Sequence, residues 1–293
     1  MDPHLLRTFV TVARCGSFSA AADELGYTQS AISQHIAALE KDLGAALLER
    51  RPVAPTEAGA RLLEHAGPIL LRLAAARADL ARLAAGPATR LVLGASALAP
   101  AGPLAAALAE LRRRRPRLEP TVRALGRRAV TEGVAAGDLD LGLVDGAVAP
   151  GDPLYLPAVS HLTAGRLAEH PVGVALPADH PLSRRTGLRL ADLALAGWID
   201  APDTAVPLTE LRAATGSGGF QAALRYEGLD IGSLVELIAA GHGLAVLPEA
   251  VVRPGDPVVW VPVTTPQLVH RTELLRSSTL TAAAAELTQL LGG

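Results

Sequence analysis

Apolar residues recur at helical spacing through residues 4–43, and two short stretches of small and polar residues interrupt the pattern. The first run predicts a helix over residues 4–15. The next two runs predict shorter helices that cross at a sharp turn, because Ala22 is small enough to lie at a crossing and Gly26 tolerates the positive φ that a tight turn often needs. The spacing is therefore typical of a helix-turn-helix.

The third of these helices, expected over residues 29–43, has two unlike faces. Its apolar face carries Ile32, Ile36 and Leu39. Its other face carries Gln29, Ser30, Ser33, Gln34 and His35. Such polar groups can hydrogen-bond base edges and phosphates, as a recognition helix in a major groove requires, although a solvated surface helix would show the same pattern. We expect Ser19 to cap the second helix and Thr28 to cap the third.

Two arginines and two prolines follow the third helix. Arg50 and Arg51 precede Pro52 and Pro55, and this pattern predicts a small hairpin, or wing, whose arginines reach DNA phosphates. Ordinary surface charge is the alternative. Since the formal net charge of the chain is −2, any DNA footprint depends on where the cations lie. The cations in question are Arg14, Lys41, Arg50 and Arg51.

Four motifs then occur in fixed order, namely GSFSAAA, TQSAISQHIAALE, LG followed by LLERR, and TEAG. In this order, the run from Phe18 to Gly59 resembles the N-terminal domain of LysR-type transcriptional regulators. The resemblance implies a winged helix-turn-helix DNA-binding domain over residues 1–58. The candidate DNA-binding residues are Thr28, Gln29, Ser30, Ser33, Gln34, His35, Arg50 and Arg51. Many members of the family carry Arg or Lys where this chain has Gln34, Ala37 and Ala38, so we expect weaker nonspecific electrostatic attraction to DNA.

From Thr56 onward, apolar residues recur at alternating steps of four and three, the spacing of a coiled-coil seam. The seam consists of Leu62, Ala66, Ile69, Leu73, Ala76, Leu80 and Leu83. We expect a linker helix over residues 59–86 that Pro68 should bend. The small domain before it cannot bury such a helix, so the seam favours pairing with a second copy, which suits paired DNA half-sites. Packing on its own chain is the alternative.

Beyond Gly86-Pro87, short apolar runs alternate with helical patterns, which predicts a mostly parallel sheet with helices on both faces. The motifs GDLDLGLV, PADHPL, DLALAGWI and LVELIAAGHGLAVLP resemble the effector-binding part of the same family. The resemblance implies two α/β subdomains of periplasmic-binding-protein type, joined by two crossovers near residues 160–164 and 264–269. The expected subdomains are residues 87–161 with 267–293, and residues 162–266.

In such a fold, a ligand lies in the cleft between subdomains, near the carboxyl ends of strands and the amino ends of helices. Residues that follow strands are therefore candidates, and the resemblance implies effector contacts at several of them. The candidate effector-binding residues are Ser96, Ala97, Arg127, Ala201, Pro202, Asp203 and Thr204. Helix capping or exposure to solvent is the alternative for each. The sequence does not identify the effector.

Other kinds of site find little support. The single cysteine, Cys15, excludes an intrachain disulfide and a multi-thiolate metal centre, and the histidines lack metal-binding spacing. No GxSxG, Walker A or GxGxxG motif is present, and Lys41 is the only lysine. The run Arg112–Arg115 is expected to end a helix, where cations complement the dipole. We therefore expect no enzyme activity, no catalytic residue, no cofactor and no metal.

The favoured function is a ligand-responsive regulator that binds double-stranded operator DNA as a homodimer through the linker helix, or as a dimer of dimers. Two alternatives stay open: a small-molecule receptor without DNA function, and a hydrolase or transferase that uses the cleft. With 49% hydrophobic residues, no leader and no membrane-spanning run, we expect a folded, cytoplasmic protein without membrane contact.

Overall fold

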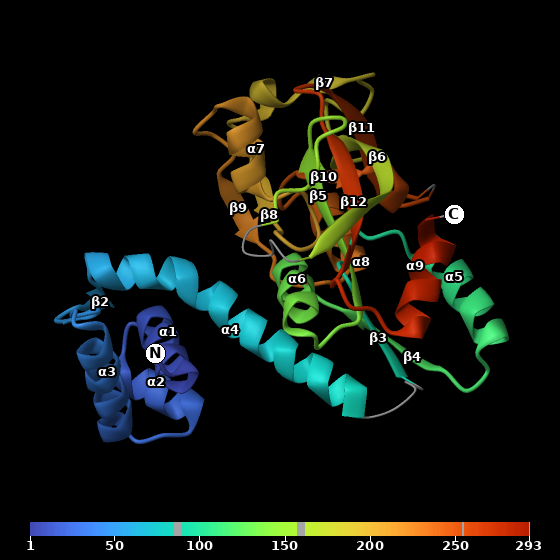
Figure 1. Cartoon of the computed structure of the whole chain (residues 1–293). Coiled ribbons are helices and arrows are strands. Elements are labelled where there is room, and N and C mark those ends of the chain that lie inside the picture. Colours follow the sequence, from blue (N-terminus) through green and yellow to red (C-terminus); the bar gives the residue numbers. More distant parts are fainter. Residues whose placement is uncertain (85–89, 157–161, 254, 293) are drawn as a thin grey trace. The chain divides into compact units, whose positions relative to one another are not determined.

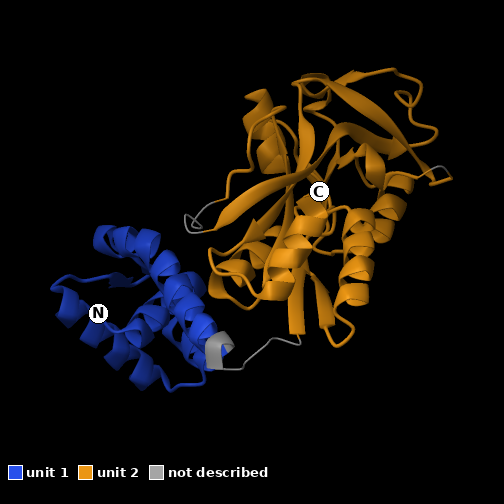
Figure 2. Ribbon diagram, turned by 45° about the vertical axis from the view of Figure 1, so that its right-hand side comes forward, with its two compact units in different colours: residues 1–81 blue, residues 82–293 orange. Residues whose placement is uncertain are grey.

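The computed structural model describes residues 1–84, 90–156, 162–253 and 255–292. The chain divides into two compact units, residues 1–81 (unit 1) and residues 82–293 (unit 2), as Figure 2 shows. The predicted boundary at Gly86-Pro87 lies outside the described residues. Among the described helices, none is both long and apolar enough to cross a bilayer.

Unit 1 is a winged helix-turn-helix followed by a long helix (Figure 1). Its elements are α1 (Pro3–Cys15), α2 (Phe18–Leu25), α3 (Gln29–Leu43), β1 (Leu48–Arg50), β2 (Val53–Pro55) and the larger part of α4 (Glu57–Ala84). The first three helices pack around a common core that includes Leu6, Phe9, Val12, Ala22, Ile32, Ile36 and Leu39. The predicted apolar face of the third helix is confirmed, and β1 pairs antiparallel with β2 to form the wing.

Of three residues predicted to shape the ends of α2 and α3, two have the predicted role and one does not. Gly26 adopts the left-handed conformation at φ 70°, and Thr28 caps α3. The cap predicted at Ser19 is wrong, because α2 begins at the buried Phe18 and Ser19 lies inside the helix. Ser17 caps the helix instead: its backbone is extended, and its hydroxyl oxygen accepts a hydrogen bond from the N–H three residues on.

The two ends of the apolar seam of α4 differ in how far they are buried. Its first half packs on the unit 1 core through Leu62, Leu63, Ala66, Ile69 and Leu70. The helix begins so close to the wing that a Cβ built on Gly59 would lie 2.0 Å from the carbonyl oxygen of Leu47. Further along, Leu80 is 67% exposed. Packing on the same chain therefore accounts for the start of the seam and leaves Leu80 uncovered.

Unit 2 contains the remaining elements (Figure 1). Its helices are α5 (Ala101–Arg114), α6 (Arg127–Ala136), α7 (Leu208–Thr215), α8 (Ile231–Ala239), α9 (Ala282–Gly292) and the 3-10 turns η1 (Leu190–Leu193) and η2 (Glu249–Val251). Its strands are β3 (Arg90–Ala95), β4 (Glu119–Ala124), β5 (Leu141–Val148), β6 (Thr163–Pro177), β7 (Leu188–Arg189), β8 (Trp198–Asp200), β9 (Ala222–Arg225), β10 (Ala245–Pro248), β11 (Val258–Thr265) and β12 (Val269–Arg276).

The first lobe of unit 2 is built on β4, β3 and β5, which run parallel, with β12 antiparallel beside β5. Alternate residues of β3 face opposite sides: Leu91 and Leu93 pack with α5 and α9, whereas Val92 packs with α6. Helices therefore cover both faces, as the alternating apolar runs predicted.

The second lobe continues the same sheet through β6, whose residues 172–177 pair with β10 and β11. Val174 and Leu176 pack with α7 and the buried Trp198 on one face, while Ala175 packs with α8 on the other. The predicted two-lobed α/β architecture is thus confirmed. The boundaries of the two subdomains stay a prediction.

The prediction of a mostly parallel sheet is wrong, because β12 and β6 run antiparallel to the strands beside them. The sequence VHRTELLR at residues 269–276 forms β12, which pairs with both β5 and the first half of β6. Its polar residues hide the alternation that normally identifies a buried strand. The first predicted crossover, near residues 160–164, falls partly outside the described residues, because residues 160 and 161 are not described. The second, near residues 264–269, overlaps the connection between β11 and β12.

Candidate functional site

Helix α3 presents a polar surface next to its capped amino end. The Oγ1 of Thr28 accepts from the N–H of Ala31 at 3.2 Å. Thr28, Gln29, Ser30 and Gln34 are exposed, and Ser33 is half-buried. Most of the side chains that the sequence placed on this face are therefore open to a partner.

His35 differs from its neighbours, because its ring turns toward α1. Its Nδ1 is hydrogen-bonded to the Thr8 hydroxyl at 3.3 Å, and its ring centroid lies 4.9 Å from that of His4 and 5.5 Å from that of Tyr27. The Tyr27 hydroxyl in turn lies 3.3 Å from the Nε2 of His4. This cluster fixes how α3 meets α1, a role that helical spacing does not reveal.

The four cations considered for a DNA footprint differ in how much of their charge is free. Arg14 is ion-paired with Glu24. Arg50 lies 3.6 Å from Glu40 and its guanidinium stacks 5.0 Å from the centroid of the Phe18 ring. In the part of the chain that the structure describes, Arg51 and Lys41 have no ion-pair partner, and both are exposed. The wing tip therefore keeps one free positive charge.

A second basic group lies at the amino end of α1. Arg7 and Arg77 line a hollow of about 390 Å³ together with His4 and Tyr27. Neither arginine has an ion-pair partner within the described residues. Sequence reasoning missed this group, because its members come from α1, α4 and the turn before α3.

In unit 2, Arg127 ties the two lobes together. It is the first residue of α6, and its guanidinium donates to the carbonyl oxygens of Pro202 and Ala205 in the second lobe. Its Nη2 also lies 2.8 Å from the Oδ2 of Asp145 in β5. All of these contacts are within the protein, so the guanidinium is already satisfied where an effector contact was expected.

Asp203 makes the matching contact from the second lobe. Its Oδ1 accepts from the backbone N–H of Arg127 at 3.0 Å. A Cβ built on Gly126, the N-cap of α6, would lie 2.8 Å from both carboxylate oxygens. Because the first turn of a helix offers free N–H groups to anions, Asp203 occupies the anion-binding end of α6 itself.

Asp145, which pairs with Arg127, has a second partner in β12. The Oδ2 of Asp145 lies 2.9 Å from the Nε2 of His270, and both residues are buried. Burial by itself raises the pKa of Asp145, but the Arg127 guanidinium and the His270 hydrogen bond outweigh it and hold that pKa below its usual range. Nearby, burial raises the pKa of Glu210 against the opposing effect of Arg127.

The other predicted effector residues are mostly closed off. Ser96 follows β3 and precedes α5, which begins at Ala101. Its buried hydroxyl donates to the carbonyl oxygen of Leu143 at 3.1 Å. Ala201 and Thr204 are also buried, and Pro202 is half-buried. The structure therefore brings the predicted residues together, but as a packed contact between the lobes.

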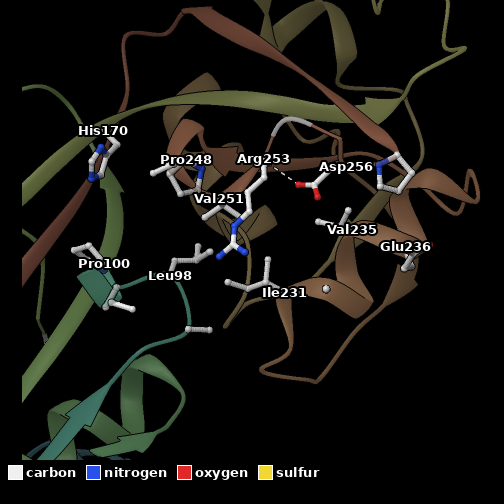
Figure 3. Close-up of a pocket in the computed structure, with 16 residues that line it drawn as sticks. Leu98, Pro100, His170, Ile231, Val235, Glu236, Pro248, Val251, Arg253 and Asp256 are labelled. Atoms are coloured by element: carbon white, nitrogen blue, oxygen red, sulfur yellow. Dashed lines mark hydrogen bonds between the residues drawn. The ribbon is translucent and has the colours of Figure 1, made fainter. Parts of the chain in front are cut away.

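Open space between the lobes lies beside Ala97, and none of the residues of the Arg127–Asp203 contact lines it. A cavity of about 400 Å³ separates loop 97–101 of the first lobe from α8 and η2 of the second (Figure 3). Its apolar walls include Leu98, Pro100, Ile231, Val235, Pro248 and Val251. Its polar lining consists of His170, Glu236, Arg253 and Asp256. Of the predicted effector residues, Ala97 alone appears in this lining, because the cavity is formed by segments far apart in the sequence.

Metal binding gains no support from the geometry. Within residues 1–84, 90–156, 162–253 and 255–292, no three His, Cys, Asp or Glu side chains converge as metal ligands. The buried group around Asp145 is an ion-pair network that joins β5, α6 and β12.

Comparison with known proteins gives two matches to family models. Residues 3–60 match "Bacterial regulatory helix-turn-helix protein, lysR family", and residues 84–292 match "LysR substrate binding domain". The chain is 34% identical over 200 residues to the small neutral protease regulatory protein of Streptomyces coelicolor, covering 67% of this chain and 58% of that protein. It is 30% identical over 266 residues to the uncharacterized HTH-type regulator YnfL of Escherichia coli, covering 88% and 86%. For several of the relatives, including the Streptomyces coelicolor protein, the match spans less than two thirds of the relative's own length.

Solved structures show the same fold over the whole chain. The crystal structure of CbnR, a LysR family transcriptional regulator, aligns with a TM-score of 0.54 at 22% identity, covering 100% of this chain and 98% of that one. Full-length CbnR has also been solved in complex with its target DNA, and that structure aligns with a TM-score of 0.51 at 21% identity, covering 100% and 99%.

Proposed function

The chain belongs to the LysR family of bacterial helix-turn-helix regulators, and we propose that it is a DNA-binding transcription regulator whose activity depends on a small-molecule effector. The observation that carries the proposal is the exposed polar face of α3, held by the Thr28 cap and the unit 1 core beside a basic wing. That arrangement matches the docking of a recognition helix in a major groove. The solved complex of CbnR with its target DNA supports the same role.

The proposed DNA contacts divide by chemistry. Gln29, Ser30, Ser33 and Gln34 read base edges, and Thr28 holds the helix end that approaches the groove. Arg50 and Arg51 bind phosphates and set position rather than sequence. His35 acts as a positioning residue, since its ring is engaged with Thr8 and His4.

A homodimer would present two copies of α3 to two half-sites. The uncovered end of α4 supports pairing through this helix, because Leu80 is 67% exposed although it follows the spacing of a coiled-coil seam. Two such dimers joined through their unit 2 surfaces would make the dimer of dimers. The effector would bind between the lobes of unit 2, where the cavity beside Ala97 is open.

The test is fluorescence anisotropy with duplex DNA from upstream of the gene, measured against scrambled DNA over a range of salt. We expect Gln29→Ala to weaken specific binding by about 5- to 150-fold, the equivalent of roughly 1–3 kcal/mol for a lost base contact, and to leave nonspecific binding unchanged. Arg51→Ala should weaken both and reduce the salt slope by about one. Arg61→Ala is the matched control, because Arg61 is an exposed arginine on α4 paired with Glu64. Equal affinity for upstream and scrambled DNA would refute the proposal.

A further inference from the structure

The cavity between the lobes has the size and the walls of a small-molecule site. Its volume of about 400 Å³ lies within the range of roughly 300–1,000 Å³ that is usual for ligand pockets. Leu98 approaches from the first lobe, and Ile231 and Val235 approach from α8 (Figure 3). A ligand with an aliphatic part would remove these side chains from water.

The charges in this lining do not neutralise one another. Asp256 is used locally, because its Oδ2 accepts from the backbone N–H of Arg253 at 2.6 Å. Neither the Arg253 guanidinium nor the Glu236 carboxylate has a hydrogen-bond or ion-pair partner among the described residues. Figure 3 shows the Arg253 side chain pointing between Leu98 and Ile231, toward the apolar walls.

The sum of these charges selects a class of ligand. A simple anion would pair with Arg253 but would face the two carboxylates of Glu236 and Asp256. A simple cation would pair with a carboxylate but would leave the exposed guanidinium without a charged partner. A molecule that carries both charges satisfies both sides, since a guanidinium binds a carboxylate through two parallel hydrogen bonds and a carboxylate binds an ammonium.

We propose that this cavity binds a small zwitterion with an apolar side chain, of the chemical class of the aliphatic α-amino acids. Arg253 pairs with its carboxylate and Glu236 with its ammonium, while the side chain lies against Leu98, Ile231 and Val235. The inference rests on the proposed function, because it names the class of effector that the regulator would bind.

The test is isothermal titration calorimetry of the full-length protein with L-leucine as the probe. Two isosteres each lack one charge: 4-methylpentanoate has no ammonium and 3-methylbutylamine has no carboxylate. We expect L-leucine to bind the wild type and each isostere to bind at least about tenfold more weakly, because each loses one charge-assisted contact. Arg253→Gln and Glu236→Gln should each weaken L-leucine binding to a similar extent.

Matched controls are available on the same lobe. Arg225 and Glu227 form an exposed ion pair outside the cavity, so Arg225→Gln and Glu227→Gln should bind L-leucine within about twofold of the wild type. No binding of L-leucine, equal binding of 4-methylpentanoate, or unchanged binding by both cavity variants would each overturn the inference. Operator binding measured with and without L-leucine separates the two proposals: if it occurs while L-leucine does not bind, only the assignment of the ligand fails, and if it is absent under both conditions while L-leucine binds, the regulatory function fails.

Discussion

The contact between Asp203 and α6 can be removed with one substitution. Asp203→Ala deletes the carboxylate that accepts from the N–H of Arg127 at 3.0 Å and that lies over Gly126. The variant leaves the backbone N–H of Arg127 without its carboxylate acceptor at the amino end of α6. Water can enter because Asp203 is only half-buried, so the cost should fall at the low end for a hydrogen bond to a charged group.

That low end is about 1.5 kcal/mol. For a domain of about 150–250 residues, each kcal/mol shifts the midpoint by roughly 2–4 °C, so Asp203→Ala should lower the Tm of unit 2 by about 3–6 °C. Differential scanning calorimetry of the full-length protein measures this shift. Asp179→Ala is the control, because Asp179 is an exposed aspartate in a turn of the same unit and should change the Tm by less than about 1 °C.

Acetate should restore the lost stability, since it supplies the carboxylate that the variant lacks. The Tm of Asp203→Ala should rise with acetate along a saturating curve, while the Tm of the wild type should not, because the site is already filled. Acetamide, which has no charge, should have a much smaller effect. The reasoning would be refuted if the variant melted like the wild type, or if acetate raised both melting temperatures equally.

Three further changes test other parts of the structure. Leu80→Lys should convert a dimer into a monomer in multi-angle light scattering, because it places a charge in the uncovered seam of α4; an unchanged dimer would contradict pairing through that helix. Burial raises the pKa of Glu210, so the stability linked to its protonation is present below the unfolded pKa and is lost as pH rises through the folded pKa. Glu210→Gln should therefore raise the Tm at about pH 7.5 but not at about pH 4. A shift of the Tm that does not depend on pH would count against this reasoning. Gly59→Ala should lower both the Tm of unit 1 and DNA affinity, because its Cβ would lie 2.0 Å from the Leu47 carbonyl oxygen, whereas Gly67→Ala, with open space around it, should be tolerated.

The helices of unit 1 could be predicted because their sequence signals are local. The spacing of Ile32, Ile36 and Leu39, the glycine in the turn and the Thr28 cap all act within a few residues. The misplaced cap at Ser19 shows the limit of this reasoning. Two serines stand near the start of α2, and the choice between them depends on the burial of Phe18, which is a tertiary contact.

Strand β12 could not be predicted, because its polar residues are buried with partners that are distant in the sequence. His270 pairs with Asp145 of β5, and Arg271 pairs with Glu169 of β6 at 2.8 Å. In isolation, such residues indicate a surface segment. Only the completed sheet shows that each charge has a partner, which is how charged side chains become tolerable in a protein interior.

The same limit applies to the effector site. Counting residues after strands correctly selected Arg127 and Asp203 as side chains between the lobes, but it could not show that they bind each other. The open cavity depends instead on where loop 97–101, α8 and η2 approach one another. Arg253 and Glu236 gave no signal in the sequence, because neither follows a parallel strand of the predicted sheet.

The Arg127–Asp203 contact and the open cavity both lie between the two lobes of unit 2. Ligand binding in the cavity and formation of this contact are therefore thermodynamically linked. Arg127 and Asp203 hold α6 against loop 201–205, and a ligand in the cavity would bridge loop 97–101 and α8. Both interactions favour the close approach of the lobes, so each should strengthen the other. Asp203→Ala should therefore weaken L-leucine binding several-fold although Asp203 does not line the cavity, and acetate should restore the affinity together with the Tm. An unchanged Kd in Asp203→Ala would mean that the Arg127–Asp203 contact and ligand binding are not coupled.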